Sequence, residues 1–181
     1  MNTKSNAWLA RLLIPLVVGF VVLLLVIVLL SRAFGATNDA VRVASPAPAF
    51  SLRVGREPAV KLSDFKGKAL IVCFMAAGDK YSQKQMPILD GLLKEYGETN
   101  LAVLCIAFEQ SGAEPIKTYA EEQGFSLPFY PATYEIVQAF GGLTAVPTLF
   151  VIDKNQNIIQ KYIGITESNA LSTQLKAVFK Q

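Results

Sequence analysis

The chain has 181 residues, of which 52% are hydrophobic, and a formal net charge of +3 at pH 7. It contains no histidine, which excludes Ser-His and Cys-His catalysis, imidazole ligation of haem and histidine-bearing zinc sites. The excess positive charge lies at Lys4, Arg11 and Arg32, because basic and acidic residues balance in the rest of the chain. We therefore expect no nucleic-acid-binding surface.

The first predicted element is a membrane-spanning helix over residues 12–30. This run, LLIPLVVGFVVLLLVIVLL, carries no charge and is bounded by Arg11 and Arg32. At ~1.5 Å per residue, it spans the ~30 Å hydrocarbon core of a bilayer. The alternative is a cleaved signal peptide, whose apolar region is usually only ~7–15 residues long. Residues 1–11 would form a short tail, for which Lys4 and Arg11 favour a cytoplasmic position.

A polar, proline-bearing stretch follows the anchor and predicts a linker over residues 31–44 that leads to one folded domain over residues 45–181. The domain opens with a predicted hairpin, in which the segments 49–52 and 59–62 pair around Gly55.

Strands and helices then alternate along the domain. Apolar or alternating runs predict strands at 69–75, 101–108, 127–130, 148–152 and 158–163. Helical spacing of apolar residues predicts helices at 82–96, 113–123, 132–140 and 167–180, with Ser168 as the N-cap of the last. This order predicts an α/β fold in which helices cover both faces of a central sheet.

The segment between the strand at 69–75 and the following helix is the candidate functional site. Asp79 stands where the helix begins, and aspartate is a preferred N-cap residue. Ser82 has no histidine to activate it, and Lys80 or Lys84 would serve as its base only if burial lowered the lysine pKa. We therefore expect Ser82 to be an ordinary serine on the helix surface.

The two cysteines, Cys73 and Cys105, each lie inside an apolar run that predicts a buried strand. Free cysteine is among the most buried residue types, so we expect core thiols rather than a redox pair. If the two strands pair side by side, a disulfide across them would need unusual geometry.

Four stretches, taken together, resemble the thioredoxin fold. They are SPAPAFSL at 45–52, LSDFKGK and the following strand at 62–75, Met86-Pro87 in the helix, and AVPTLFVID at 145–153. The chain is most similar to the membrane-tethered TlpA/ResA-like thiol-disulfide oxidoreductases, which are redoxins (AhpC/TSA-like). The resemblance implies a thioredoxin-like fold with a central mixed sheet over residues 45–180. It also implies a cis peptide at Val146-Pro147, the one bond type that adopts cis at low cost.

The chain departs from this family at its active site. The family has Trp-Cys-x-x-Cys where this chain reads Gly78-Asp79-Lys80-Tyr81-Ser82. Thiol-disulfide exchange needs an attacking thiolate and a mixed disulfide, and aspartate and serine form neither, so we expect no catalytic residue here. Asp79 either caps the helix alone or also imitates the family's thiolate, since a helix N-terminus stabilises negative charge.

The resemblance further implies a groove for a protein or peptide partner at Lys80, Tyr81, Val146 and Pro147. We expect neither a metal nor a cofactor in this groove. Tyr81, Phe129, Tyr130 and Tyr134 could line this groove, although aromatic residues at such spacings more often lie in the core or half-buried over it.

Three functions remain open from the sequence. The leading hypothesis is a redox-inactive binding or assembly module, anchored in the bacterial cytoplasmic membrane by residues 12–30 with its domain facing the periplasm or cell exterior. The alternative is a thiol-disulfide oxidoreductase or peroxiredoxin-like enzyme of cell-envelope redox homeostasis or cytochrome c maturation, working through Cys73 or Cys105. The third is a subunit of a larger membrane complex whose anchor makes the main contact.

Overall fold

The structure, a computed structural model, describes residues 15, 20, 45–108 and 114–180 of the chain. The predicted membrane span over residues 12–30 and the linker over 31–44 therefore lie almost wholly outside the described residues. Within the described part of the chain, no helix combines the length and the apolar character needed to cross a bilayer. The chain divides into two compact units, Met1–Thr37 and Asn38–Gln181. The second unit contains every element described below.

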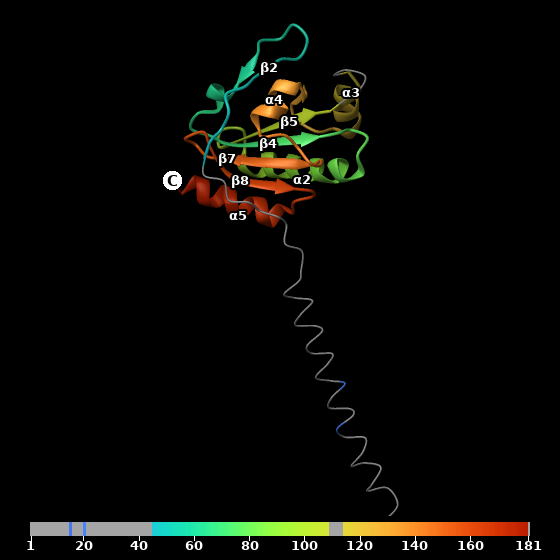
Figure 1. The fold of residues 1–181 in the computed structure, drawn as a ribbon, viewed down its shortest axis with the longest axis vertical. Coiled ribbons are helices and arrows are strands. Elements are labelled where there is room, and N and C mark those ends of the chain that lie inside the picture. The colour runs from blue at the N-terminus through green and yellow to red at the C-terminus, as the bar shows by residue number, and fades with distance from the viewer. Residues whose placement is uncertain (1–14, 16–19, 21–44, 109–113, 181) are drawn as a thin grey trace, which may run out of the picture. The chain divides into compact units, whose positions relative to one another are not determined.

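A six-stranded mixed sheet forms the centre of the domain (Figure 1). Its strands lie in the order β1, β8, β7, β4, β5, β6. Their bounds are Ser45–Pro46 for β1, Ala69–Met75 for β4, Leu101–Ala107 for β5, Phe129–Pro131 for β6, Thr148–Ile152 for β7 and Asn157–Ile163 for β8. β4, β5 and β6 run parallel, whereas β7 is antiparallel to both β4 and β8. The prediction of a mixed sheet is confirmed.

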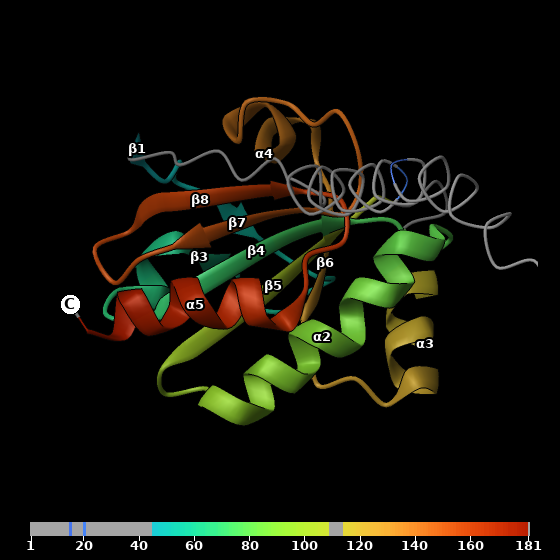
Figure 2. The same ribbon diagram turned by 90° about the horizontal axis from the view of Figure 1, so that it is seen from below.

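Helices cover both faces of this sheet, as Figure 2 shows. One face packs against α2 (Lys80–Tyr96) and α5 (Ser168–Phe179), and α3 (Glu114–Gln123) lies beside α2. The other face is covered by α4 (Tyr134–Ala139), the short hairpin of β2 (Ser51–Leu52) and β3 (Val60–Lys61), and the 3-10 helix η1 (Leu62–Phe65).

The two cores follow from the alternation of side chains along the buried strands. In β4, Ile71 and Cys73 point toward α2 and α5, whereas Val72 and Phe74 point toward α4. Every residue of β4 is buried, which is why its sequence is an unbroken apolar run rather than an alternating one.

The observed elements differ from the predicted ones at several places; α2, for example, begins at Lys80 rather than at residue 82. β1 was not predicted, because a two-residue strand that contains Pro46 has no periodic pattern to detect. The predicted N-cap at Ser168 is wrong, because Ser168 is already the first helical residue of α5 and the extended Glu167 holds the cap position. The predicted hairpin before β4 is confirmed by the antiparallel pairing of β2 and β3.

Three phenylalanine rings hold the end of α4 against the sheet. The ring centroid of Phe74 lies 5.3 Å from that of Phe140 and 5.9 Å from that of Phe150, and Phe140 and Phe150 are 4.8 Å apart. All three pairs meet edge to face, an arrangement that contributes ~0.5–1.5 kcal/mol per pair beyond the buried area. Phe74 is therefore central to the core under α4.

We predict that Phe74→Ala lowers the free energy of unfolding by ~3–5 kcal/mol, because a buried ring is lost and a cavity remains. Phe108→Ala is the matched control, since the Phe108 ring also neighbours Phe74 but is 37% exposed. Its expected cost is about 1 kcal/mol. Chemical denaturation of both variants measures the difference, and equal losses would contradict the central role of Phe74.

Candidate functional site

The candidate site lies where β4 ends and α2 begins. Asp79 is the N-cap of α2, and its Oδ2 accepts the backbone N–H of Ser82 at 2.7 Å. The backbone at Asp79 is extended, as an N-cap requires, and the helix continues from Lys80 without a break. The prediction that Asp79 caps the helix is confirmed.

Ser82 lies inside the protein rather than on the helix surface, so the prediction for this residue is wrong. It is fully buried, and its Oγ accepts the backbone N–H of Ala76 at 3.2 Å. The Ser82 hydroxyl faces the loop between β4 and α2, because it accepts the N–H of Ala76 in that loop. Lys80 and Lys84 are both exposed, so neither lies in the buried environment in which a lysine could serve Ser82 as a general base.

The two cysteines lie directly opposite each other on β4 and β5, and both are free thiols with no exposed surface. Burial raises the pKa of the Cys73 thiol far above its usual range. Burial also raises the pKa of the Cys105 thiol, and the neighbouring Cys73 adds to that rise. The thiolate form is therefore disfavoured at both positions, and the prediction of buried core cysteines is confirmed.

A groove of about 380 Å³ lies beside the start of α2, where the chain enters β7. The peptide Val146-Pro147 is cis, as expected from the resemblance. The groove brings together two of the predicted site residues, Tyr81 and Val146, whereas Pro147 is buried and Lys80 is not part of the lining. The remaining lining residues were not predicted: Ala145, Ile163, Gly164 and Ile165.

Tyr81 forms an accessible wall of this groove. Its side chain is 47% exposed, and the Lys80 Nζ lies 4.9 Å from the centroid of its ring. A cation over an exposed ring contributes ~0.5–1 kcal/mol, which favours this orientation of the ring. Lys80 does not line the groove itself, but it stabilises the position of the Tyr81 ring, which does.

A buried glutamine connects α2 to the other side of the groove. Gln85 Nε2 donates to the backbone oxygen of Thr166 at 3.1 Å, and Gln85 Oε1 accepts the Thr166 N–H at 2.7 Å. The N–H of Gly164 in turn donates to the backbone oxygen of Pro147 at 2.8 Å. Gly164 has a φ of 87°, a conformation that favours glycine. These bonds hold the loop after β8 between α2 and the cis peptide.

Sequence reasoning missed this support, although one signal was present. Gln85 is a polar residue on the apolar side of α2, in the turn after Ser82, and a buried polar side chain needs a hydrogen-bonding partner. Its partner Thr166 lies 81 residues away along the chain, so no local pattern identifies it.

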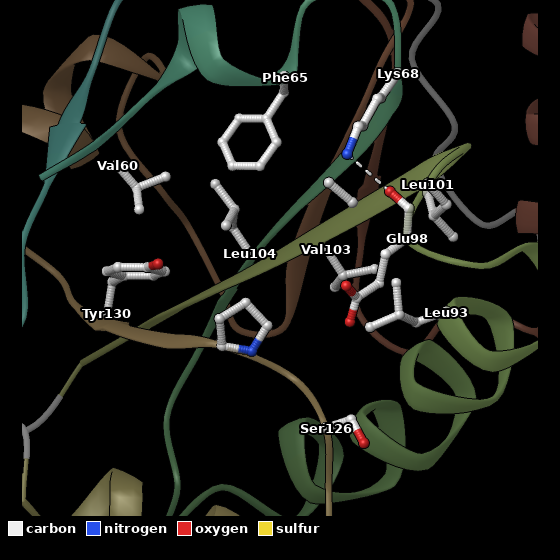
Figure 3. Close-up of a pocket in the computed structure, with 12 residues that line it drawn as sticks. Val60, Phe65, Lys68, Leu93, Glu98, Leu101, Val103, Leu104, Ser126 and Tyr130 are labelled. Carbon is white, nitrogen blue, oxygen red and sulfur yellow. Dashed lines mark hydrogen bonds between the residues drawn. The ribbon is translucent and has the colours of Figure 1, made fainter. Parts of the chain in front are cut away.

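A second pocket, of about 340 Å³, lies at the amino end of β5 (Figure 3). It exists because β6 pairs only with Cys105–Ala107, which leaves the outer edge of β5 uncovered over residues 101–104. Phe65 and Tyr130 form its apolar side, and the Lys68 Nζ donates to the backbone oxygen of Glu98 at 2.9 Å across its rim. None of the predicted site residues lines this pocket.

Among the residues that the structure describes, no three acidic or cysteine side chains gather closely enough to hold a metal ion. The groove residues present apolar surface and backbone groups, so the arrangement suits contact with a polypeptide.

We predict that neither native cysteine reacts with an aromatic disulfide reagent in the folded protein at pH 9, where an ordinary exposed thiol is largely ionised. Burial raises both thiol pKa values, so the reactive thiolate is scarce, and the reagent has no access. Denaturant should release both thiols in full. Rapid labelling of either thiol without denaturant would contradict the assignment and favour a thiol enzyme.

Comparison with known proteins places the chain in a family. The model of the AhpC/TSA family matches residues 43–161. The chain is 24% identical to the thiol-disulfide oxidoreductase ResA of Bacillus anthracis, over 97% of this chain and 98% of that protein. It is 27% identical to ResA of Geobacillus thermodenitrificans, over 90% and 95% of the two chains.

The solved structures agree with this placement. A thiol:disulfide interchange protein of the thioredoxin family from Chlorobium tepidum superposes with a TM-score of 0.68 and 28% identity, covering 75% of this chain and 97% of that one. The fold, the cis peptide beside the start of α2 and these matches point to the same group. The chain belongs to the AhpC/TSA family and is a thioredoxin-fold protein of the ResA-like kind.

Proposed function

We propose that this chain is a membrane-anchored binding or assembly module that holds a protein or peptide partner in the groove beside Tyr81 and Val146, without thiol-disulfide exchange. The observation that carries the proposal is a groove that remains open next to a helix start at which oxygen atoms replace sulfur. The relatives named thiol-disulfide oxidoreductases indicate the family of this chain. The chain differs from the family pattern because Asp79 and Ser82 stand where the resemblance places the two cysteines.

The chemistry of exchange has no reactive group at this site. An exchange reaction requires a thiolate that attacks a disulfide and a second thiol that resolves the mixed disulfide. At the start of α2, Asp79 and Ser82 are both engaged in hydrogen bonds to the backbone. Cys73 and Cys105 are buried in the core with raised pKa values, which argues against the alternative of an enzyme that works through them.

The distribution of exposed aromatic residues supports binding at this edge of the sheet. Met75, Ala107 and Pro131 are aligned across β4, β5 and β6, so the carboxyl ends of these strands share one edge. Within the described part of the domain, the large exposed hydrophobic side chains Tyr81 and Phe108 follow closely after the ends of β4 and β5, whereas Tyr134 lies apart from the groove lining, at the start of α4. Exposed apolar residues gathered at one place are typical of interaction surfaces.

Asp79 would give this surface a charge that the relatives show only in their reduced state. Its carboxylate stands at the helix N-terminus, where negative charge is favoured by ~0.3–1 kcal/mol, and its cap bond fixes it there. The position would then present a carboxyl group, which does not change with redox conditions, beside the groove.

We place the protein at the bacterial cytoplasmic membrane, with residues 12–30 as a single-pass anchor and the domain on the periplasmic or exterior side. The support is the uncharged apolar run itself and the basic residues Lys4 and Arg11 before it. An anchored domain with no catalytic step suits a role in which it holds its partner close to the membrane.

We predict that Tyr81→Ala weakens binding of reduced, carboxymethylated α-lactalbumin by about tenfold, because the ring forms an accessible wall of the groove. This unfolded probe has no free thiols, so only non-covalent binding is measured, by fluorescence anisotropy. Tyr134→Ala is the matched control, since Tyr134 is 75% exposed but does not line the groove, and we expect a change of less than about twofold. Failure of the native protein to bind, or equal losses in both variants, would contradict the proposal.

A further inference from the structure

The second pocket is a slot that follows the outer edge of β5 (Figure 3). Its lining includes four consecutive residues of that strand, 101–104. Consecutive residues of a strand point to opposite faces of the sheet, so a pocket that all four line runs along the edge of the strand. At ~3.3 Å per residue, these four residues extend for about 13 Å, which is the length of a short strand.

The backbone of Val103 points into this slot. The N–H of Cys105 donates to the backbone oxygen of Pro128, so the backbone groups of Cys105 face β6. Alternate residues of a strand direct their N–H and C=O groups to the same side, so those of Val103 and Leu101 also face outward. The Leu101 N–H donates to the backbone oxygen of Gly97, whereas the pairing with β6 does not reach Val103.

Val103 therefore presents both a donor and an acceptor to the slot. No other described residue binds its N–H or its C=O on that side. Only 2% of Val103 is exposed, and buried backbone groups almost always have a hydrogen-bonding partner. A ligand that carries an N–H and a C=O side by side, as a polypeptide backbone does, matches this pair of groups.

The two sides of the slot are both apolar. Phe65 and Tyr130 stand on one side and pack against the core under α4, whereas Leu93 on the other side belongs to the core under α2. An extended peptide directs alternate side chains to opposite faces of the sheet that it joins. Apolar side chains at successive positions of such a peptide would contact the two sides in turn.

At the amino end of β5, the side chain of Glu98 brings a negative charge to the slot. Figure 3 shows its carboxylate directed toward Val103 and Leu93. The Lys68 Nζ donates to the backbone oxygen of Glu98, and no ion pair joins the Glu98 carboxylate to a described residue. A basic residue in the ligand would complement this charge.

We propose that the slot binds an extended, apolar peptide segment that contains a basic residue and adds a short strand to the edge of β5. The peptide backbone exchanges hydrogen bonds with Val103, and the basic residue pairs with Glu98. A small apolar molecule would fill the same volume of about 340 Å³ without using these backbone groups. The slot shares no lining residue with the groove beside Tyr81, so the proposal is independent of the function proposed for that groove.

Amide hydrogen exchange of the full chain in detergent micelles tests the backbone pairing. The probe is the peptide acetyl-Arg-Val-Tyr-Val-Arg-amide, added in large excess. We expect the Val103 N–H to exchange at least about tenfold more slowly with the peptide, because the peptide accepts its hydrogen bond. The Leu104 N–H faces β4, so it is the matched control and should not change. An unchanged Val103 N–H, or equal slowing at both residues, would overturn the proposal.

Fluorescence anisotropy with a labelled form of this peptide tests its backbone and its charge separately. A probe N-methylated at its three central residues keeps every side chain but loses backbone donors, so it should bind at least about tenfold more weakly. Glu98→Lys should weaken binding at least about fivefold, because it reverses the charge beside the slot. Glu95→Lys is the matched control, since Glu95 is exposed on α2 outside the lining, and we expect a change of less than about twofold. Equal affinity for the two peptides, or equal losses in the two variants, would overturn the proposal, the first in favour of a small apolar ligand.

Discussion

Asp79 Oδ2 accepts the N–H of Ser82, and Ser82 Oγ accepts the N–H of Ala76, so two side chains close the loop between β4 and α2 onto the helix. The relatives are named thiol-disulfide oxidoreductases, and thiol-disulfide exchange requires sulfur atoms that are free to form and break bonds. Here both side chains are committed to backbone donors, and Ser82 is buried. Hydrogen bonds thus fix the start of α2, and Tyr81, which lines the groove, lies between Asp79 and Ser82 in the chain.

The groove persists because its geometry does not depend on sulfur. Gln85 binds both backbone groups of Thr166, and Gly164 binds the carbonyl of Pro147, so α2, the loop after β8 and the cis peptide are held together by hydrogen bonds. The hydrogen bonds that shape the groove are thus made by backbone and amide groups and involve no sulfur atom. In this member of the AhpC/TSA family, the groove therefore keeps its shape while both native thiols lie in the core.

The parts of the fold that were predictable have strong local patterns. β4 and β5 are unbroken apolar runs, and Asp79 stands where an N-cap belongs, so the sheet, the helix start and the buried cysteines follow from the sequence. The burial of Ser82 was not predictable, because which side of the first helical turn faces inward depends on how the preceding loop folds back. The groove lining at Ile163–Ile165 lies over 80 residues from Tyr81, and only the assembled sheet brings them together.

The most direct test of the account is insulin reduction by the full chain in the presence of dithiothreitol, beside the variant Asp79→Cys/Ser82→Cys. The account predicts that the native protein adds nothing to the rate of the reductant alone, since its thiols are buried with raised pKa values. The variant should accelerate the reaction, because the helix N-terminus and the groove beside it are already in place. Acceleration by the native protein, or a folded variant without activity, would contradict it.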